Sequence, residues 1–430
     1  MALNLVSLGG LAVLLGFAAL LSTDRRRINP RVILWGLAIQ FAFAAFIFGV
    51  PLGSELFLRV SRAVERVLRA ARAGTRFCFG ILAAAPGEEG SLGFILLFQG
   101  LATIVFFAAL MEVLYYFGIV PWILKQFSRV FTRLMRVSGA ESLCTASNIV
   151  VGIESATTIR PFLERMTSSE LCTILTAGLA TIASSVLGLY VLMLKDTFPN
   201  IAGHLVSASF LSAPAALVMS KMLLPESEVP ETLGTAVKPH YERPANLMAA
   251  VMRGADAGGR LVLGILVLLL AVLGLVELVN MGLEWLSAKL AALAGGPVDL
   301  SLPALLGWMF YPFAVVIGAP LTDAAAIARL LGERAVLTEV PAYQHLAQML
   351  QAGNLTERGA VLASYALCGF THVAAVGIFT GGIAALAPRT SGKLAAVAAR
   401  AFLAATLACL MTAAVAGVFY HGGSLLYAGR

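Results

Sequence analysis

Long apolar segments alternate along the chain with short polar or basic stretches. The clearest apolar segments are 3–21, 32–50, 94–120, 171–194, 261–279 and 401–419. A helix needs about 20 apolar residues to cross a bilayer, and only helices and closed barrels satisfy their backbone in lipid. Because no stretch alternates apolar and polar residues as a strand does, the pattern predicts a bundle of membrane-spanning helices.

Two further segments, 138–166 and 320–350, are interrupted by small, polar and helix-breaking residues. Each has an acid near its middle, Glu154 in the first and Glu339 in the second, and each precedes a longer apolar segment that carries a polar interruption of its own. Broken segments at corresponding positions of two halves are typical of a transporter binding site. The pattern therefore predicts two re-entrant hairpins.

Basic residues predict the orientation of the chain. The cluster 25–31 follows the first apolar segment, so the positive-inside rule places this loop in the cytoplasm and Met1 outside. Three later basic stretches fit the same orientation as cytoplasmic loops: 125–136, 221–260 and 389–400. Arginines from Arg59 to Arg76 recur at helical spacing and predict an amphipathic helix in the interface, although counting spans places it on the outer side.

Composition excludes a soluble enzyme. Charged residues make up 12% of the 430 positions, against about 25% in soluble domains. The formal net charge is +7, and the basic residues that give it lie between the predicted spans. Anionic lipid head groups are sufficient partners for them there, so nucleic acid is not an expected partner. Five cysteines lie in or beside apolar segments without disulfide-like or metal-like spacing: Cys78, Cys144, Cys172, Cys368 and Cys409.

Four regions are expected along the chain. Region 1–137 holds scaffold helices and the interfacial helix, and 138–223 the first hairpin with its transport helices. Region 224–302 holds a polar loop, whose proline-rich part is 224–255, and a scaffold helix. Region 303–430 holds the second hairpin and its transport helices.

Acids and amides within apolar segments are the candidate chemistry. An acid at mid-membrane depth costs roughly 2.5–3.5 kcal/mol and is functional by default, so Glu154 and Glu339 are interpreted as acceptors for a solute or a proton. The alternative is an ion pair or a helix cap. Asn148 with the hydroxyl of Thr181 suits a hard cation, although such residues also bond across helix interfaces.

Other ionisable residues divide by their surroundings. His372 is the only histidine deep in an apolar segment, and it either relays protons or bonds a solute, or is satisfied by a backbone carbonyl. The remaining histidines fall in or near loops: His204, His240, His345 and His421. Glu112 and Glu277 lie in unbroken helices and are expected to bond between helices, and Arg160 is expected to snorkel to the surface.

Several short motifs occur in a specific order along nearly the whole chain. They are Ser138 to Ser142, Asn148 to Gly152, Ile159 to Leu171, Ala180 to Gly188, Ser212 to Ala216, Leu331 to Tyr343, Tyr365 to Phe370 and Gly381 to Pro388. Together they resemble the concentrative nucleoside transporter family. The resemblance implies an all-α polytopic membrane protein with about eight transmembrane helices and two re-entrant helical hairpins in an inverted repeat.

The resemblance also implies a homotrimer in the bacterial inner (plasma) membrane, crossed many times by each chain. A scaffold around the third and sixth helices holds a transport unit that moves like an elevator, driven by sodium or protons. Asn148, Thr181 and the carbonyls of Val151 and Ile182 align with the sodium site. Glu339 aligns with the acid that binds ribose hydroxyls.

Departures from the family concentrate in the solute site. The family's Gly-Gln-Thr-Glu-Ala-Pro becomes Gly152 to Thr157, one residue shorter before Ile159, and Ile153 replaces the glutamine that reads the nucleobase. Glu154 aligns with the family's glutamate only across a gap. Asparagine gives way to Thr338, and the ribose-contacting asparagine and serine align with His372 and Ala375. The candidate solute residues are Ile153, Glu154, Ser155, Thr338, Glu339, Phe370, His372 and Ala375.

The sequence thus predicts an ion-coupled symporter that imports nucleosides or nucleoside-like solutes, with no cofactor besides Na⁺ or H⁺. The acid-and-histidine pocket leaves open a different small polar or cationic metabolite on the same fold. A passive channel is a further alternative. An enzyme is not expected, because the chain shows no nucleophile–histidine–acid arrangement and no metal-binding pattern such as HExxH.

Overall fold

The computed structural model describes residues 2–85, 88–294 and 300–421, with the side chain of Ile153 and those of 290–294 left out of the description. Within these residues the fold is helical, apart from one isolated bridge between Ser138 and Leu233. The predicted helical bundle is therefore confirmed. Long apolar segments become helices because a helix pairs every interior backbone group within itself.

Sixteen α-helices occur within the described ranges. They are α1 (Ala2–Leu20), α2 (Pro30–Gly49), α3 (Pro51–Phe79), α4 (Ala102–Tyr116), α5 (Ile119–Met135), α6 (Gly139–Ser147), α7 (Ser168–Ala180), α8 (Ser184–Leu194), α9 (Ile201–Leu223), α10 (Leu247–Ala294), α11 (Leu302–Val316), α12 (Leu321–Val336), α13 (Glu339–Gln351), α14 (Glu357–Leu367), α15 (Val373–Leu386) and α16 (Ser391–Phe419). A π-helical turn, η3 (Leu96–Leu101), precedes α4. Short 3₁₀ segments are η1 (Arg25–Arg27), η2 (Gly80–Ala83), η4 (Ile153–Ile159), η5 (Leu163–Arg165) and η6 (Pro388–Thr390).

Seven helical stretches in the described part are long and apolar enough to cross a bilayer, judged by length and composition. They are Ala2–Leu20, Pro30–Gly49, Leu96–Tyr116, Ser168–Leu194, Ile201–Leu223, Leu247–Lys289 and Pro388–Phe419. Two shorter apolar helices, α11 and α15, add to them. The fold is thus a polytopic membrane protein of about the expected number of spans.

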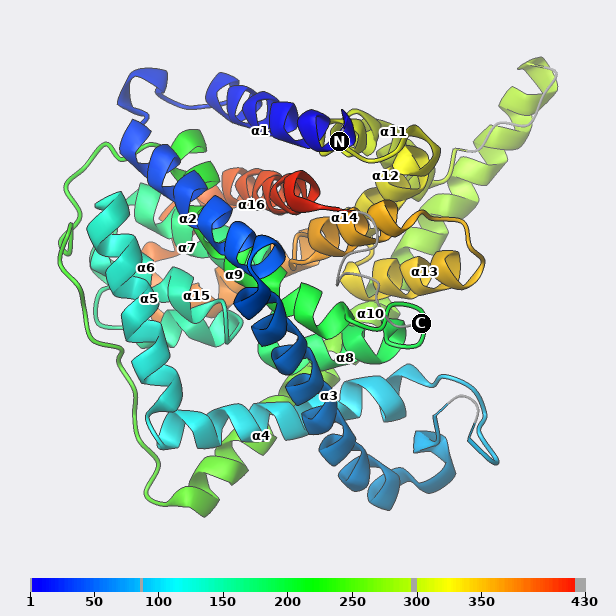
Figure 1. The fold of residues 1–430 in the computed structure, drawn as a ribbon, viewed down its shortest axis with the longest axis horizontal. Coiled ribbons are helices and arrows are strands. Elements are labelled where there is room, and N and C mark those ends of the chain that lie inside the picture. The colour runs from blue at the N-terminus through cyan, green and yellow to red at the C-terminus, as the bar shows by residue number, and fades with distance from the viewer. Residues whose placement is uncertain (1, 86–87, 295–299, 422–430) are drawn as a thin grey trace.

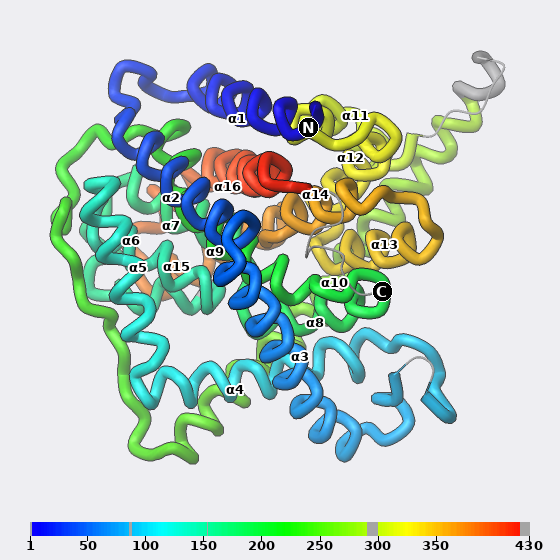
Figure 2. Tube along the Cα trace, viewed as in Figure 1, coloured from blue at the N-terminus to red at the C-terminus, as the bar shows by residue number. Residues whose placement is uncertain are grey.

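The two halves of the chain repeat one order of elements. In the first half a hairpin of α6 and η4 is followed by the broken pair α7 and α8 and then by α9. In the second half α12 and α13 form the hairpin, α14 and α15 the broken pair, and α16 the closing helix. Helix α16 packs against α7, α9 and α14, so the two repeats share one interior. Figure 2 shows α1 beside α11, which it also contacts.

Helix α10 stands apart from this interior. It is 48 residues long, runs behind the other helices and projects beyond them at its C-terminal end (Figure 1). It packs along α4, while large apolar side chains such as Leu270, Leu275 and Leu278 are exposed on it. An apolar surface of this kind is typical of a lipid-facing or subunit-facing helix.

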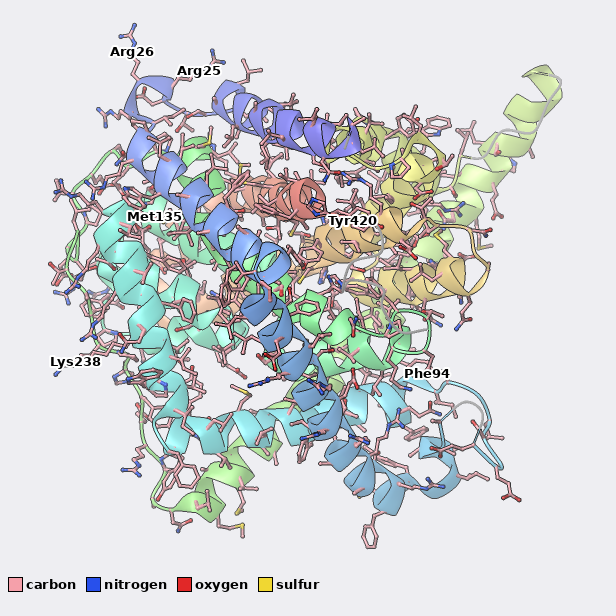
Figure 3. The ribbon with its side chains drawn as sticks, in the orientation of Figure 1. Arg25, Arg26, Phe94, Met135, Lys238 and Tyr420 are labelled. Atoms are coloured by element: carbon pink, nitrogen blue, oxygen red, sulfur yellow. The ribbon has the colours of Figure 1, made fainter. Side chains whose placement is uncertain are left out.

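Three basic segments differ from the expected loops. Residues 125–136 fall mostly within α5, whose apolar residues at three-to-four spacing are buried while Lys125 and Arg129 lie beside this stripe and are half-buried. Residues 389–390 end η6 and residues 391–400 open α16, while the polar loop ends at residue 246, where α10 follows. Lys238 is exposed on that loop, as Figure 3 shows. The amphipathic helix is confirmed as α3.

Candidate functional site

The first hairpin begins with α6 and turns back at residues 148–152. A capping box of Ser138 and Glu141 starts α6, and the helix ends at Ser147. The amide of Val151 donates to the carbonyl of Ser147 over 2.8 Å, which closes the turn. The chain continues as η4, so the tip of the hairpin is irregular backbone inside the helical bundle.

The tip of this hairpin packs against the break between α7 and α8. Thr181 and Ala183 have extended backbone between the two helices. The amide of Ser184 donates to the carbonyl of Val150 over 3.1 Å. A Cβ on Gly152 would lie 3.2 Å from the Cβ of Ala183, so glycine suits this close approach.

Oxygen atoms without hydrogen-bond donors gather at this contact. Asn148 is fully buried, and its Oδ1 has no partner among the described residues. The carbonyls of Val151 and Ile182 accept no backbone hydrogen bond within the described ranges. The hydroxyl of Thr181 donates to a carbonyl of its own helix over 2.8 Å, which leaves its lone pairs available. Such an oxygen set suits a hard cation.

The second hairpin places an acid at a helix start. Helix α12 ends at Val336 and α13 begins at Glu339, with the hydroxyl of Thr338 accepting from the amide of Val340 over 3.3 Å. Glu339 is therefore the first residue of a helix, where the positive end of the helix dipole favours a carboxylate.

His372 caps the second broken helix. The sequence predicts it within an apolar helix, whereas in the structure it is the N-cap of α15, after a break that follows Leu367. Its Nδ1 accepts from the amide of Ala375 over 3.2 Å. In a neutral imidazole the proton therefore belongs on Nε2, an assignment made from the hydrogen bonds.

Glu339 is held between two side chains. The hydroxyl of Tyr190 donates to Oε1 over 2.7 Å, and Nε2 of His372 lies 3.2 Å from Oε2. The ring of Tyr343 stacks on Tyr190 with 4.5 Å between centroids. Three elements, α8, α13 and the break before α15, thus fix the carboxylate. The sequence analysis does not include Tyr190, although it is the only phenol on α8 and stands among apolar residues after Ser184 and Ser185.

The two broken helices touch each other at their breaks. A Cβ on Gly369 would lie 2.9 Å from the carbonyl oxygen of Leu179 and 2.8 Å from Sγ of Cys409. Only a residue without a side chain fits there without a shift. The break that carries Thr181 and the break that carries His372 are therefore neighbours in the fold.

A cavity of about 110 Å³ lies at these two breaks. Six of the predicted solute residues line it: Glu154, Thr338, Glu339, Phe370, His372 and Ala375. The remaining wall of the cavity includes an apolar side from α10, which the sequence analysis does not predict. This side consists of Leu261, Ile265, Leu268 and Leu269. These four residues belong to a uniformly apolar run, so no local signal distinguishes them from lipid-facing positions.

Two predicted solute residues are not seen in the cavity wall. Ser155 is buried away from it, with its hydroxyl 3.5 Å from Sγ of Cys144. The η4 turn points this side chain into the hairpin, because the amide of Ser155 closes a tight turn on the carbonyl of Gly152. The side chain of Ile153 lies outside the described part of the structure.

A second cavity of about 360 Å³ adjoins the first. The two share Glu154, Ser185 and Leu261 in their walls, so Glu154 stands at their junction. Hairpin 1, α4, α10 and the loop residues His240 and Tyr241 line the second cavity. The amide of His240 donates to the carbonyl of Thr158 over 2.8 Å, which ties this loop to the hairpin.

Glu112 faces the second cavity and is paired. Arg253 forms an ion pair with it, and the hydroxyl of Tyr241 donates to it over 3.1 Å. Burial and the nearby carboxylate of Glu112 raise the pKa of Tyr241 to about 12, so this phenol stays a donor at neutral pH. Bonding between helices is confirmed for Glu112. Glu277 is exposed on α10 and has no such partner among the described residues.

The structure differs in part from the sequence-based expectations for Arg160 and His204. Arg160 is mostly exposed, yet it lines the second cavity 3.9 Å from Glu242. His204, expected near a loop, is fully buried at the start of α9. Its ring packs against Phe57 and Tyr365, because α9 begins inside the bundle.

Three family models match successive parts of the chain. Residues 9–82 match the Na⁺ dependent nucleoside transporter N-terminus, 97–197 the nucleoside recognition (Gate) model, and 204–417 the Na⁺ dependent nucleoside transporter C-terminus. The nucleoside permease NupC of Helicobacter pylori is 33% identical, over 97% of this chain and 98% of its own. The chain belongs to the concentrative nucleoside transporter family.

Other members cover the chain as fully. An uncharacterized transporter of Haemophilus influenzae is 35% identical over 98% of this chain and 99% of its own. Mouse solute carrier family 28 member 3 is also 35% identical, but the chain spans only 59% of its length. The structure of CNTnw in an inward-facing substrate-bound state aligns with a TM-score of 0.86 at 34% identity, over 97% of this chain and 98% of that one.

Proposed function

We propose that this concentrative nucleoside transporter family member is a sodium-coupled symporter that carries nucleosides or nucleoside-like solutes across the bacterial inner membrane. The observation that carries the proposal is the meeting of two hairpin tips with two broken helices around one cavity. The Na⁺-dependent character of the family supports sodium as the coupling ion.

The candidate cation site and the solute cavity both include residues from the tip of the first hairpin. Asn148 offers a buried oxygen without a donor, and Gly152 and Glu154, a few residues on, line the solute cavity. An ion bound at Asn148 would therefore order the backbone that presents Glu154. Binding of one ligand to an element that the other also needs gives positive coupling between them.

The division of the bundle supports an elevator-like movement. Hairpins, broken helices, α9 and α16 share one interior, whereas α10 and α4 pack on each other beside it. We assign the interior to the moving unit and α4 with α10 to a scaffold. The exposed apolar residues of α10 support lipid or subunit contacts in a homotrimer.

Uptake by proteoliposomes of the purified chain tests the proposal. Radiolabelled nucleosides should accumulate under an inward Na⁺ gradient and not under an equal choline gradient. Equilibration of the nucleoside in choline at the same rate as with Na⁺, without accumulation under either gradient, would instead indicate a passive channel. Uptake of unrelated small polar metabolites, with no nucleoside transported, would favour the alternative solute class that the changed pocket residues leave open.

A further inference from the structure

Of the described acids that line the two cavities, Glu154 is the one without a paired carboxylate. Among the described residues its carboxylate makes no hydrogen bond or ion pair, while the hydroxyl of Thr157 donates to its backbone carbonyl over 2.6 Å. The other cavity acids have partners: Glu339 contacts Tyr190 and His372, Glu112 contacts Tyr241 and Arg253, and Glu242 lies near Arg160 and His240. The backbone of Glu154 is fixed and its side chain is left for a ligand.

The two acids of the smaller cavity, whose wall also holds Ser185 and Thr338, differ in their neighbours. At Glu339 a carboxylate lies beside the N–H of His372, so this end offers an acceptor and a donor together. Hydroxyl groups both donate and accept, and a ribose diol therefore suits this end. An ionised Glu154 only accepts. No amide, lysine or arginine side chain is among the described residues that line this cavity.

We propose, on the basis of the proposed nucleoside transport, that Glu154 selects nucleosides whose base carries an amino group, and guanosine most strongly. Carboxylates accept hydrogen bonds from exocyclic amines of bases. Guanine presents its ring N1–H and its amino group side by side, and one carboxylate accepts both in a two-point contact. Cytosine and adenine offer an amino group beside a ring nitrogen that only accepts.

Bases without an amino group fit Glu154 poorly. Uracil and thymine present a single ring N–H between two carbonyl oxygens, whose lone pairs face the carboxylate. Hypoxanthine presents its ring N–H beside a C–H group, which gives the second carboxylate oxygen no hydrogen bond. Guanosine and inosine differ only by the amino group, so they form the sharpest pair. Losing one hydrogen bond to a charged group costs about 1.5–3 kcal/mol, which corresponds to an affinity ratio of about 10 to 150.

Competition in proteoliposomes under a Na⁺ gradient measures this ratio. Guanosine should inhibit uptake of labelled cytidine at concentrations at least about tenfold lower than inosine does. In Glu154→Gln the guanosine-to-inosine ratio should fall close to one. Glu164→Gln, which changes an exposed acid 3.7 Å from Arg389 at the far end of the same hairpin, should keep the wild-type ratio.

The outcomes separate the selectivity from the transport proposal. Equal inhibition by guanosine and inosine, or a guanosine preference that survives Glu154→Gln, overturns the selectivity while nucleoside transport stands. Absence of Na⁺-driven uptake of every nucleoside overturns both. If Glu154→Gln does not fold, guanosine and inosine are compared by the thermal shift they give the wild-type protein, and equal shifts overturn the selectivity.

Discussion

The two hairpins use their acids in opposite ways. In the second hairpin Glu339 is buried and already bonded to Tyr190 and near His372, each from a different element. In the first hairpin Glu154 has no partner among the described residues, and Asn148 keeps an oxygen without a donor. The acid of the second hairpin is held by side chains of other elements before any ligand arrives, whereas the acid of the first hairpin is not.

This difference indicates where ligands complete the structure. A buried polar group without a partner costs about 1–3 kcal/mol, and native proteins carry few of them without a reason. At the tip of the first hairpin Oδ1 of Asn148 is such a group among the described residues, and Glu154 beside it has an unpaired carboxylate. We therefore expect changes in the second hairpin to damage a finished site, and changes in the first to alter which ligand is bound.

The largest effect is expected for Glu339→Ala. It removes the preassembled acceptor and leaves Tyr190 and His372 facing an empty space, so nucleoside affinity should fall about 100-fold or more. Uptake kinetics and nucleoside-induced thermal shifts measure the loss. Glu333→Ala, which removes a buried acid of the same hairpin that pairs with His345 and does not line the cavity, serves as the control. Equal losses in both variants would show that hairpin folding, and not the Glu339 cluster, was disturbed.

Asn148→Leu tests the candidate cation site at the tip of the first hairpin. Removing a ligand oxygen should weaken Na⁺ affinity at least about tenfold, measured as the Na⁺ concentration that gives half-maximal thermal stabilisation. Asn354→Leu, on the exposed turn after α13, should leave it unchanged. Unaltered Na⁺ dependence in Asn148→Leu would remove this residue from the cation site.

Tyr190→Phe tests how much the hydrogen bond from Tyr190 to Glu339 contributes to nucleoside binding. It removes the hydrogen bond to Glu339 but keeps the stack on Tyr343, so the KM for nucleoside should rise about tenfold. Tyr343→Phe is the matched variant, because the Tyr343 hydroxyl donates to the carbonyl of Ser364 and not to Glu339. A similar KM increase in both variants would mean that general packing is responsible.

Gly369→Ala tests the contact between the two broken helices, and it has the smallest expected effect on ligand binding. Its Cβ would press on Leu179 and Cys409, and overpacking of this kind costs about 1–3 kcal/mol. Gly377→Ala on α15 has no neighbour within 4 Å and should be neutral or slightly stabilising. Thermal denaturation in detergent compares the two variants, and an unchanged Tm in Gly369→Ala would contradict the close contact.

Much of the fold follows from the sequence because apolar length and helix breaks are local signals. The segments 138–166 and 320–350 were identified as hairpins from their small and polar residues, and the structure has them as α6 with η4 and as α12 with α13. The prediction of a loop at 125–136 is wrong, because basic residues indicate a surface position while the buried stripe of α5 is apparent only at helical spacing.

The site was only partly predictable, because its partners come from distant segments. Six solute residues could be named from the resemblance, but the bond from Tyr190 to Glu339 joins positions 149 residues apart. Ser155 lies one residue beyond Glu154 and turns the other way, since a tight turn decides the direction of each side chain. Pairing of Glu112 with Arg253 likewise depends on how α4 packs on α10.

Simultaneous flux of sodium and nucleoside tests the central claim most directly. Vesicles containing the purified chain are supplied with radioactive Na⁺ and a differently labelled nucleoside, and both are counted in the same sample. The account predicts that Na⁺ enters the vesicles only when nucleoside is present, and that Asn148→Leu abolishes this Na⁺ flux. Nucleoside entry at the same rate in choline, with no accompanying sodium in the wild-type protein, would contradict it.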